Sequence, residues 1–334
     1  MTQEPNKLNQ VNRGIPARLP VFAAPMLLVS GVDLVNAACR AGIVGAFPSH
    51  NARTLDDFER WMQQIIAAHE AARRERPDAI IAPWCVNLVT HSTNARLQDD
   101  LKLVARYQPP IVVTALGGPR PVMDVVHGYG GIVIADVVNM TLARKAIAVG
   151  VDGLACIAAG AGGHTGFLSP FAFISAVRAI FDGLIVVGGA ISDGHGVAGA
   201  IAAGADFVYM GTRFIPTVES MAVPAYKQMI VDSSVDDLII SSAVSGTPAS
   251  WLKPSMRAAG MDPDAPADAP KRNYDASKES PKRWKDIWAA GQGIGASTAI
   301  EPVADIVAQL EREYHDALRK MAARVNQKDQ GTRP

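Results

Sequence analysis

The sequence predicts an α/β fold, a (β/α)8 TIM barrel in which eight parallel strands alternate with helices. Short, continuous apolar runs rich in β-branched residues recur along the chain, as expected for parallel strands covered on both faces. Stretches with helix start and stop signals lie between them. Eight runs alternating with helices favour a closed barrel over a doubly wound open sheet. The expected strands are Leu19–Ala24, Ile43–Phe47, Ile80–Leu88, Ile111–Ala115, Gly131–Asp136, Gly153–Ala158, Leu184–Gly188 and Phe207–Met210.

The expected helices are indicated by their end signals. Thr54 is an N-cap, followed by acidic residues in the first turn and arginines in the last, which suits the helix dipole. Gly150 closes a later helix, and Ser169 with Pro170 supplies a cap and a first helical position. Helices are expected in residues 54–76, 92–107, 139–150 and 169–181, with the weakest helical signal in residues 117–130.

Composition excludes several classes of function. Hydrophobic residues make up 49% of the 334 residues and charged residues 19%, so the chain can bury a sizeable core. Its 32 basic and 32 acidic residues give a formal net charge of zero, without the field that recruits nucleic acid or an anionic membrane. No signal-peptide pattern opens the sequence and no run reaches the ~20 apolar residues of a membrane helix. Cys39, Cys85 and Cys156 are expected to be buried thiols in a reducing, cytoplasmic compartment.

We expect a single domain, residues 1–334, with one long excursion. After Phe214 the alternation stops, and residues 215–290 are rich in Pro, Ala and Asp. A connection of that length is usually functional or carries helices of its own. Its position directly after the eighth strand predicts an insertion that covers the barrel mouth. An amphipathic helix, roughly residues 302–324, follows it.

Residues 158–166, AAGAGGHTG, place four glycines around His164 after the sixth strand. Glycine is costly in conformational entropy, so this run suits a backbone that adopts positive φ or approaches a ligand closely. A lone histidine is usually structural. In a mouth loop, however, an imidazole with a pKa near about 6.5 can exchange protons, and this favours a catalytic His164.

Two more glycine loops follow the seventh and eighth strands. They are Gly188-Gly189-Ala190 and Met210-Gly211-Thr212-Arg213. Barrels of this class often hold a phosphate after these two strands, on backbone N–H groups at helix N-termini. Turn glycines without a ligand would explain either loop alone. Both loops at adjacent strand ends predict a phosphate site.

The other histidines are not spaced as metal ligands, so no metal is expected. His69 and His315 are expected at exposed helix positions, and His195 in a surface role.

Four further segments have two interpretations. Asn87, at the end of the third strand, suits a turn as well as an amide that bonds the edge of a heterocycle. Lys145 lies in a helix, where a solvated lysine is the default. The small residues of AAPM, 23–26, permit close approach by a ring system, and the glycine-rich turn 290–295 is placed to return to the mouth.

Together these segments resemble the nitronate monooxygenase family, formerly called 2-nitropropane dioxygenases, which are FMN-dependent TIM barrels. The matching pieces span residues 23 to 295 in family order. The glycine–histidine motif with the GTRF strand is specific for the superfamily and less specific for the substrate. The pieces are AAPM, VNLVTHSTNAR, AGAGGHTG, VVGGAISDG, GADFVYMGTRF, SGTPASWLKPS and AGQGIG.

The resemblance implies FMN as cofactor and His164 as the base that removes the α-proton of a neutral nitroalkane. Many relatives carry a Gln-Gly pair where this chain has Ile157-Ala158, so a polar contact to flavin or substrate is lost. They also have a second glycine at position 190, where alanine keeps the backbone N–H. The implied FMN contacts are Ala24, Pro25, Met26, Asn87, Lys145, Gly162, Gly163, Gly189, Ala190, Gly211, Thr212 and Gln292.

The activity implied by the resemblance is oxidative denitrification of alkyl nitronates, with nitroalkanes as further candidates, to carbonyl compounds and nitrite with O2. A homodimer is left open. Three alternatives remain. The same flavin barrel could act as an NAD(P)H:quinone or enoyl-thioester reductase. The GADFVYMGTRF segment also resembles inosine-monophosphate dehydrogenase, although no cysteine stands in the loop after strand six. A flavin carrier without catalysis would leave His164 without a purpose.

Overall fold

The computed structural model describes residues 13–263 and 283–330 of the chain and confirms the predicted barrel. Eight parallel strands follow one another around it in the order β1-β2-β3-β4-β5-β6-β8-β9. Closure comes from β1 pairing with β9, with Val21 opposite Val208. The strands are β1 (Val21–Ala23), β2 (Val44–Pro48), β3 (Trp84–Val89), β4 (Ile111–Ala115), β5 (Ile132–Val137), β6 (Gly153–Ile157), β8 (Leu184–Gly188) and β9 (Phe207–Met210).

Each expected strand overlaps an observed one, and the largest difference is at β3. The ladder there begins at Trp84 and not at Ile80. Pro83 directly precedes it and has no N–H to donate, so it marks the edge of the pairing.

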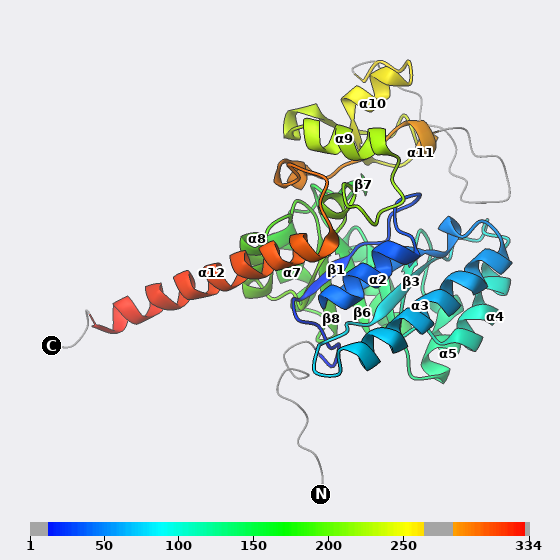
Figure 1. Cartoon of the computed structure of the whole chain (residues 1–334), viewed down its shortest axis with the longest axis horizontal. Helices are drawn as coiled ribbons and strands as arrows, with labels where there is room; N and C mark the ends of the chain where they lie inside the picture. Colours follow the sequence, from blue (N-terminus) through cyan, green and yellow to red (C-terminus); the bar gives the residue numbers. More distant parts are fainter. Residues whose placement is uncertain (1–12, 264–282, 331–334) are drawn as a thin grey trace, which may run out of the picture.

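Helices surround the barrel, as Figure 1 shows. The weakly signalled segment after β4 forms α5. The helix after β1, α2, was not among those expected, because its N-cap is Gly31 and no side chain caps it. The helices are α2 (Val32–Ala41), α3 (Leu55–Glu75), α4 (Leu97–Tyr107), α5 (Arg120–Gly128), α6 (Met140–Val149), α7 (Pro170–Arg178), α8 (Gly194–Ala202) and α12 (Val303–Gln330).

The predicted caps of α3 and α7 have different outcomes. The Thr54 side chain accepts a hydrogen bond from the Asp57 N–H, and the Asp57 carboxylate accepts one from the Thr54 N–H, which forms a capping box. Ser169 occupies the N-cap position of α7, but its side chain makes no cap hydrogen bond.

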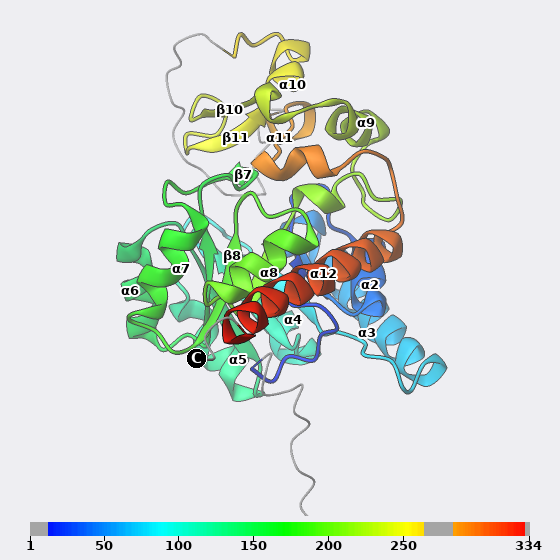
Figure 2. The same ribbon diagram turned by 90° about the vertical axis from the view of Figure 1, so that its left-hand side faces the viewer.

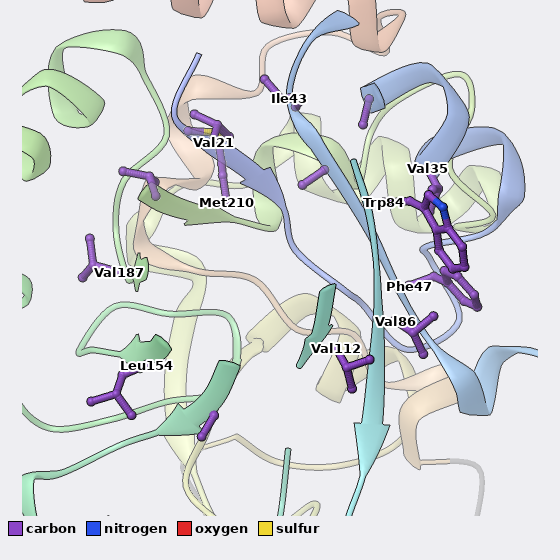
Figure 3. Packing of buried hydrophobic residues seen from close by; sticks show 14 of the residues in the cluster. Val21, Val35, Ile43, Phe47, Trp84, Val86, Val112, Leu154, Val187 and Met210 are labelled. Carbon is purple, nitrogen blue, oxygen red and sulfur yellow. The ribbon is translucent and has the colours of Figure 1, made fainter. Parts of the chain in front are cut away.

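Two apolar layers make up the core of the barrel. The outer layer packs strand residues against the helices, as with Phe47 of β2, Trp84 of β3 and Val35 of α2 (Figure 3). The inner layer fills the barrel itself, where the rings of Phe22 and Phe207 meet edge to face at 5.2 Å.

The expectation that His69 is exposed is wrong. It is 9% exposed and belongs to the buried stripe of α3. The stripe repeats at helical spacing through Phe58, Met62, Ile65, His69 and Ala72, so its periodicity would have placed the histidine inward. Burial lowers the pKa of His69, so its neutral form is favoured. His315 is exposed, as predicted.

The described part of the excursion builds a small unit beside the barrel, which Figures 1 and 2 show above the strands. A three-stranded sheet in the order β10-β11-β7 forms its centre. One expected part of the excursion, residues 264–282, lies outside the described residues. The elements are β7 (Gly163–His164), α9 (Pro224–Asp232), β10 (Leu238–Ser241), β11 (Ala249–Leu252), α10 (Lys253–Ala258) and α11 (Arg283–Asp286). Among the helices described, none is long and apolar enough to cross a membrane.

Candidate active site

The loops that follow β6 and β8 meet a turn from the end of the excursion. The carbonyl oxygen of Gly160 accepts hydrogen bonds from the N–H of Ala190 at 3.2 Å and the N–H of Gln292 at 2.9 Å. One backbone oxygen therefore joins three segments that are far apart in the sequence.

The loop after β9 joins the same cluster. The hydroxyl of Thr212 accepts a hydrogen bond from the N–H of Gly291 at 2.8 Å. At Gly162, a Cβ would lie only 2.7 Å from the nitrogen of Gly291 and 3.2 Å from the Thr212 hydroxyl. A larger residue would push these loops apart, so glycine is required here by close approach.

His164 lies in β7, directly beyond the glycines. Its backbone pairs antiparallel with Ala249 of β11, and the next residue, Thr165, donates its N–H to the Pro248 carbonyl at 3.2 Å. The Thr165 hydroxyl also donates to the carbonyl of Ala158 at 3.2 Å. The excursion and the barrel thus hold the partly buried His164 between them.

The loop after β1 is shaped by Asn51, a residue that sequence reasoning did not single out. The Asn51 amide donates to the carbonyls of Met26 at 2.9 Å and Ser30 at 2.8 Å, and it accepts the N–H of Leu28 at 2.7 Å. Leu28 has a φ of 62°, and these bonds hold it there. The loop brings Met26 to the end of β9, where its sulfur lies 3.3 Å from the position that a Cβ of Gly211 would take.

Two other predicted contacts have different positions. Asn87 is buried in β3, and its amide donates to the Val113 carbonyl at 3.4 Å. Lys145 is exposed in the middle of α6, on the outer ring of helices. The structure therefore does not bring Lys145 together with the mouth loops, as its default interpretation as a solvated helix residue implied.

The expected phosphate site needs a correction at α8. The N-terminal amides of this helix are already bonded to carboxylates: Asp193 accepts from Gly196 at 2.6 Å, and Glu313 accepts from Gly194 at 2.8 Å. The N–H of Ala190 is also used, by Gly160. A phosphate would therefore have to bind the loops after β8 and β9 and not the end of α8, where two negative charges lie.

The upper end of the barrel interior contains two polar residues that sequence reasoning missed. Asp136, near the end of β5, has its Oδ1 buried, and Tyr209, near the end of β9, is 8% exposed with a buried hydroxyl. Desolvation raises the pKa of Asp136 to about 7. The sequence feature that could have revealed Asp136 is its position as the only acidic residue in the apolar run IVIADVV.

The cysteines behave as predicted. Cys39, Cys85 and Cys156 are buried and form no disulfide. Burial raises the pKa of Cys39 and of Cys156 to about 12 each, so the reactive thiolate is disfavoured.

A cleft at the other end of the barrel is a poor candidate for the site. Arg13, Arg178 and Asp206 line it, and Asp206 forms ion pairs with Arg13 at 2.9 Å and Arg178 at 2.7 Å. The charges are thus largely paired within the protein. In barrels of this kind, chemistry occurs at the carboxyl ends of the strands.

The closed barrel places the chain in the (β/α)8 class, whose enzymes carry their chemistry at the carboxyl ends of the strands. Residues 11–313 match the family model described as nitronate monooxygenase. The chain belongs to this family of flavin-dependent oxidoreductases.

Individual relatives agree with this membership. A nitronate monooxygenase from Paraburkholderia phytofirmans is 27% identical, over 92% of this chain and 95% of that protein. A solved structure of nitroalkane oxidase from Streptomyces ansochromogenes has a TM-score of 0.75 at 21% identity, covering 95% of this chain and all of that one (100%). FabK from Thermotoga maritima has a TM-score of 0.74 at 23% identity, covering 96% and 99%. The two structures support the fold.

Proposed function

We propose that this chain is an FMN-dependent nitronate monooxygenase that converts alkyl nitronates to carbonyl compounds and nitrite with O2 in the cytoplasm. The observation that carries the proposal is the placement of His164. It stands on a short strand held between the barrel and the excursion, directly beyond the loop whose Gly160 carbonyl gathers the other mouth loops. Family membership supplies the reaction class.

The residues at the mouth fit a flat, phosphorylated cofactor. At Gly189, with a φ of 144°, a Cβ would lie 2.6 Å from the carbonyl oxygen of Ala159, so this glycine lets the loops after β6 and β8 meet closely at the mouth. No GxGxxG fingerprint of a dinucleotide site follows the first strand, which favours FMN over FAD. The residues proposed to hold FMN are Ala24, Pro25, Met26, Asn87, Gly162, Gly163, Gly189, Ala190, Gly211, Thr212 and Gln292; Lys145 is left out because it lies on the outer helix ring.

In this proposal FMN supplies the electron-transfer chemistry, and the chain supplies position and proton transfer. His164 accepts the α-proton of a neutral nitroalkane, a step that a preformed nitronate does not need. The excursion, residues 215–290, acts as the cover of the mouth. Its strand β11 holds β7. Of the two residues that replace a polar pair, Ile157 packs against the inner layer and gives the substrate side an apolar wall, whereas Ala158 is buried in the outer layer.

Two measurements test the function. The chromophore released by heating the purified protein is identified by chromatography, and FMN is expected; FAD or no flavin would contradict the proposal. Oxygen uptake is then compared with nitronate and with NADH or NADPH. We expect uptake with nitronate. Rapid anaerobic bleaching of the flavin by NADH or NADPH, without turnover of nitronate, would instead assign the chain to hydride-transfer chemistry.

A further inference from the structure

The upper end of the barrel interior contains two buried polar atoms without a hydrogen-bond partner in the described part of the chain. Oδ1 of Asp136 and the hydroxyl of Tyr209 are buried, and neither has a hydrogen-bond partner among the described residues. Buried polar groups are nearly always paired. Both residues stand one position before the carboxyl end of their strands, which is the end where a ligand enters.

Strand alternation directs both side chains into the barrel. In β5, Val133, Ala135 and Val137 belong to the outer layer and Ile134 to the inner one, so Asp136 follows Ile134 inward. Tyr209 belongs to the inner layer, with its ring 5.9 Å from that of Phe22. Burial raises the pKa of Tyr209, and the charge of an ionised Asp136 raises it further, so the two groups interact across the interior.

In the described part of the chain, the strands that neighbour Asp136 carry no positive charge. Of the neighbouring strands, β4 has no titratable residue and β6 contributes Cys156; from across the barrel come Cys85 of β3 and Tyr209 of β9. None of these is a cation. Desolvation therefore favours the neutral acid, and the pKa of Asp136 is raised to about 7. A neutral carboxylic acid can donate a hydrogen bond, as a phenol can.

We propose that the neutral Asp136 carboxylic acid and the Tyr209 hydroxyl donate hydrogen bonds to the carbonyl-bearing edge of the bound flavin, so that flavin binding is linked to a proton on Asp136. The inference rests on the proposed function, which supplies the flavin. An ionised Asp136 would set a negative charge against acceptor oxygens and lose its donor. Flavin affinity should therefore fall as the pH rises through 7.

The test measures flavin affinity of the full-length holoprotein at pH 6 and pH 8, from the fluorescence of flavin released on ultrafiltration. A group with a pKa of about 7 changes from mostly neutral to mostly ionised over this range, which weakens binding by about tenfold. Asp136→Asn keeps a donor and cannot ionise. We expect the flavin affinity of this variant not to show the tenfold loss between pH 6 and pH 8. At pH 8 it should bind flavin more tightly than the wild type.

Two further variants sharpen the result. Asp124→Asn makes the same charge change at an exposed position of α5 and should behave as the wild type. Tyr209→Phe removes one hydroxyl and should weaken flavin binding by about two- to tenfold at both pH values; unchanged binding would remove Tyr209 from the proposal. An equal pH dependence in Asp136→Asn and wild type would overturn the role of Asp136. A wild-type protein that binds no flavin would contradict the proposed function itself.

Discussion

Backbone pairing with a segment distant in the sequence, strand β11, holds His164 in position. Pairing with Ala249 fixes its strand, and the Thr165 N–H bond to Pro248 fixes the residue after it. Substitution of the imidazole removes no backbone hydrogen bond, so the loop shape and the flavin site should survive. This separates the chemical role of the residue from its structural setting.

We therefore expect His164→Ala to retain flavin and to lose turnover of neutral nitroalkane by 10²–10⁴-fold, roughly the usual contribution of a general base. Turnover of preformed nitronate should change much less, because its α-proton is already gone. Steady-state oxygen uptake with both substrates measures the difference. His315→Ala, an exposed histidine of α12, serves as the control. Equal losses on both substrates would assign His164 to binding or to a later step.

Ala190 is another residue whose backbone sets its effect. Its φ is 56°, a left-handed conformation that costs an alanine about 1–2 kcal/mol. Glycine would remove that strain. It would also raise the conformational entropy of the unfolded chain, which lowers the stability by about 0.4–1 kcal/mol. We expect Ala190→Gly to be neutral or stabilising by up to about 1 kcal/mol in urea unfolding, and Ala190→Val to be destabilising because a β-branched residue tolerates this φ poorly. A marked loss of stability in Ala190→Gly would show that the methyl group packs usefully.

At the scale of elements, two helices that both begin after a hydroxyl residue differ in how that residue caps them. Thr54 makes both bonds of a capping box with Asp57, whereas Ser169 makes no cap bond and α7 starts on Pro170. Both ends offer a hydroxyl residue, but only α3 has an acidic residue, Asp57, at the third helical position to complete a capping box. The first turn of α7 contains no acidic residue.

Thr54→Ala is expected to lower the free energy of unfolding by about 0.5–2 kcal/mol, because the Asp57 N–H in the first turn of α3 loses its acceptor, the Thr54 hydroxyl. Ser169→Ala is the matched comparison and should change it by less than about 0.5 kcal/mol. Urea unfolding followed by circular dichroism distinguishes the two. Equal losses of stability in both variants would contradict a stabilising role for the Thr54 hydroxyl bond.

At the scale of the whole molecule, a buried acid makes stability depend on pH. The pKa of Asp136 is raised from 3.8 to about 7, so the folded state holds its proton where the unfolded state has lost it. Ionisation therefore opposes folding, with no cost below pH 4, a growing cost between pH 4 and 7, and a constant cost above. Asp136→Asn should raise the free energy of unfolding at pH 8 by up to roughly 4 kcal/mol, with a higher Tm, and should hardly change either at pH 4. Thermal melts at both pH values, with Asp124→Asn as control, measure it; an equal shift at both would contradict the assignment.

Much of this architecture could be predicted from the sequence, because strands and helices are encoded by local periodicity. The glycine loops were also visible, since Gly162 and Gly189 report close backbone approach at their own positions. Asn51 and Asp136 were missed for a different reason. Their roles depend on partners such as Met26 and Tyr209, which are distant in the sequence and meet only once the barrel has closed. Lys145 shows the converse: the resemblance implied a flavin contact, but the helix places this residue on the outer ring.

The closing pair of strands has a consequence for biosynthesis. Val21 of β1 meets its partner Val208 of β9 only after the six barrel strands between them have been made. Until then the growing chain carries an open edge on β1, and such edges can pair with other chains. Contacts this distant also slow folding. We expect nascent chains that end before β9 to depend on holding chaperones, and release from them to coincide with synthesis of the last strand.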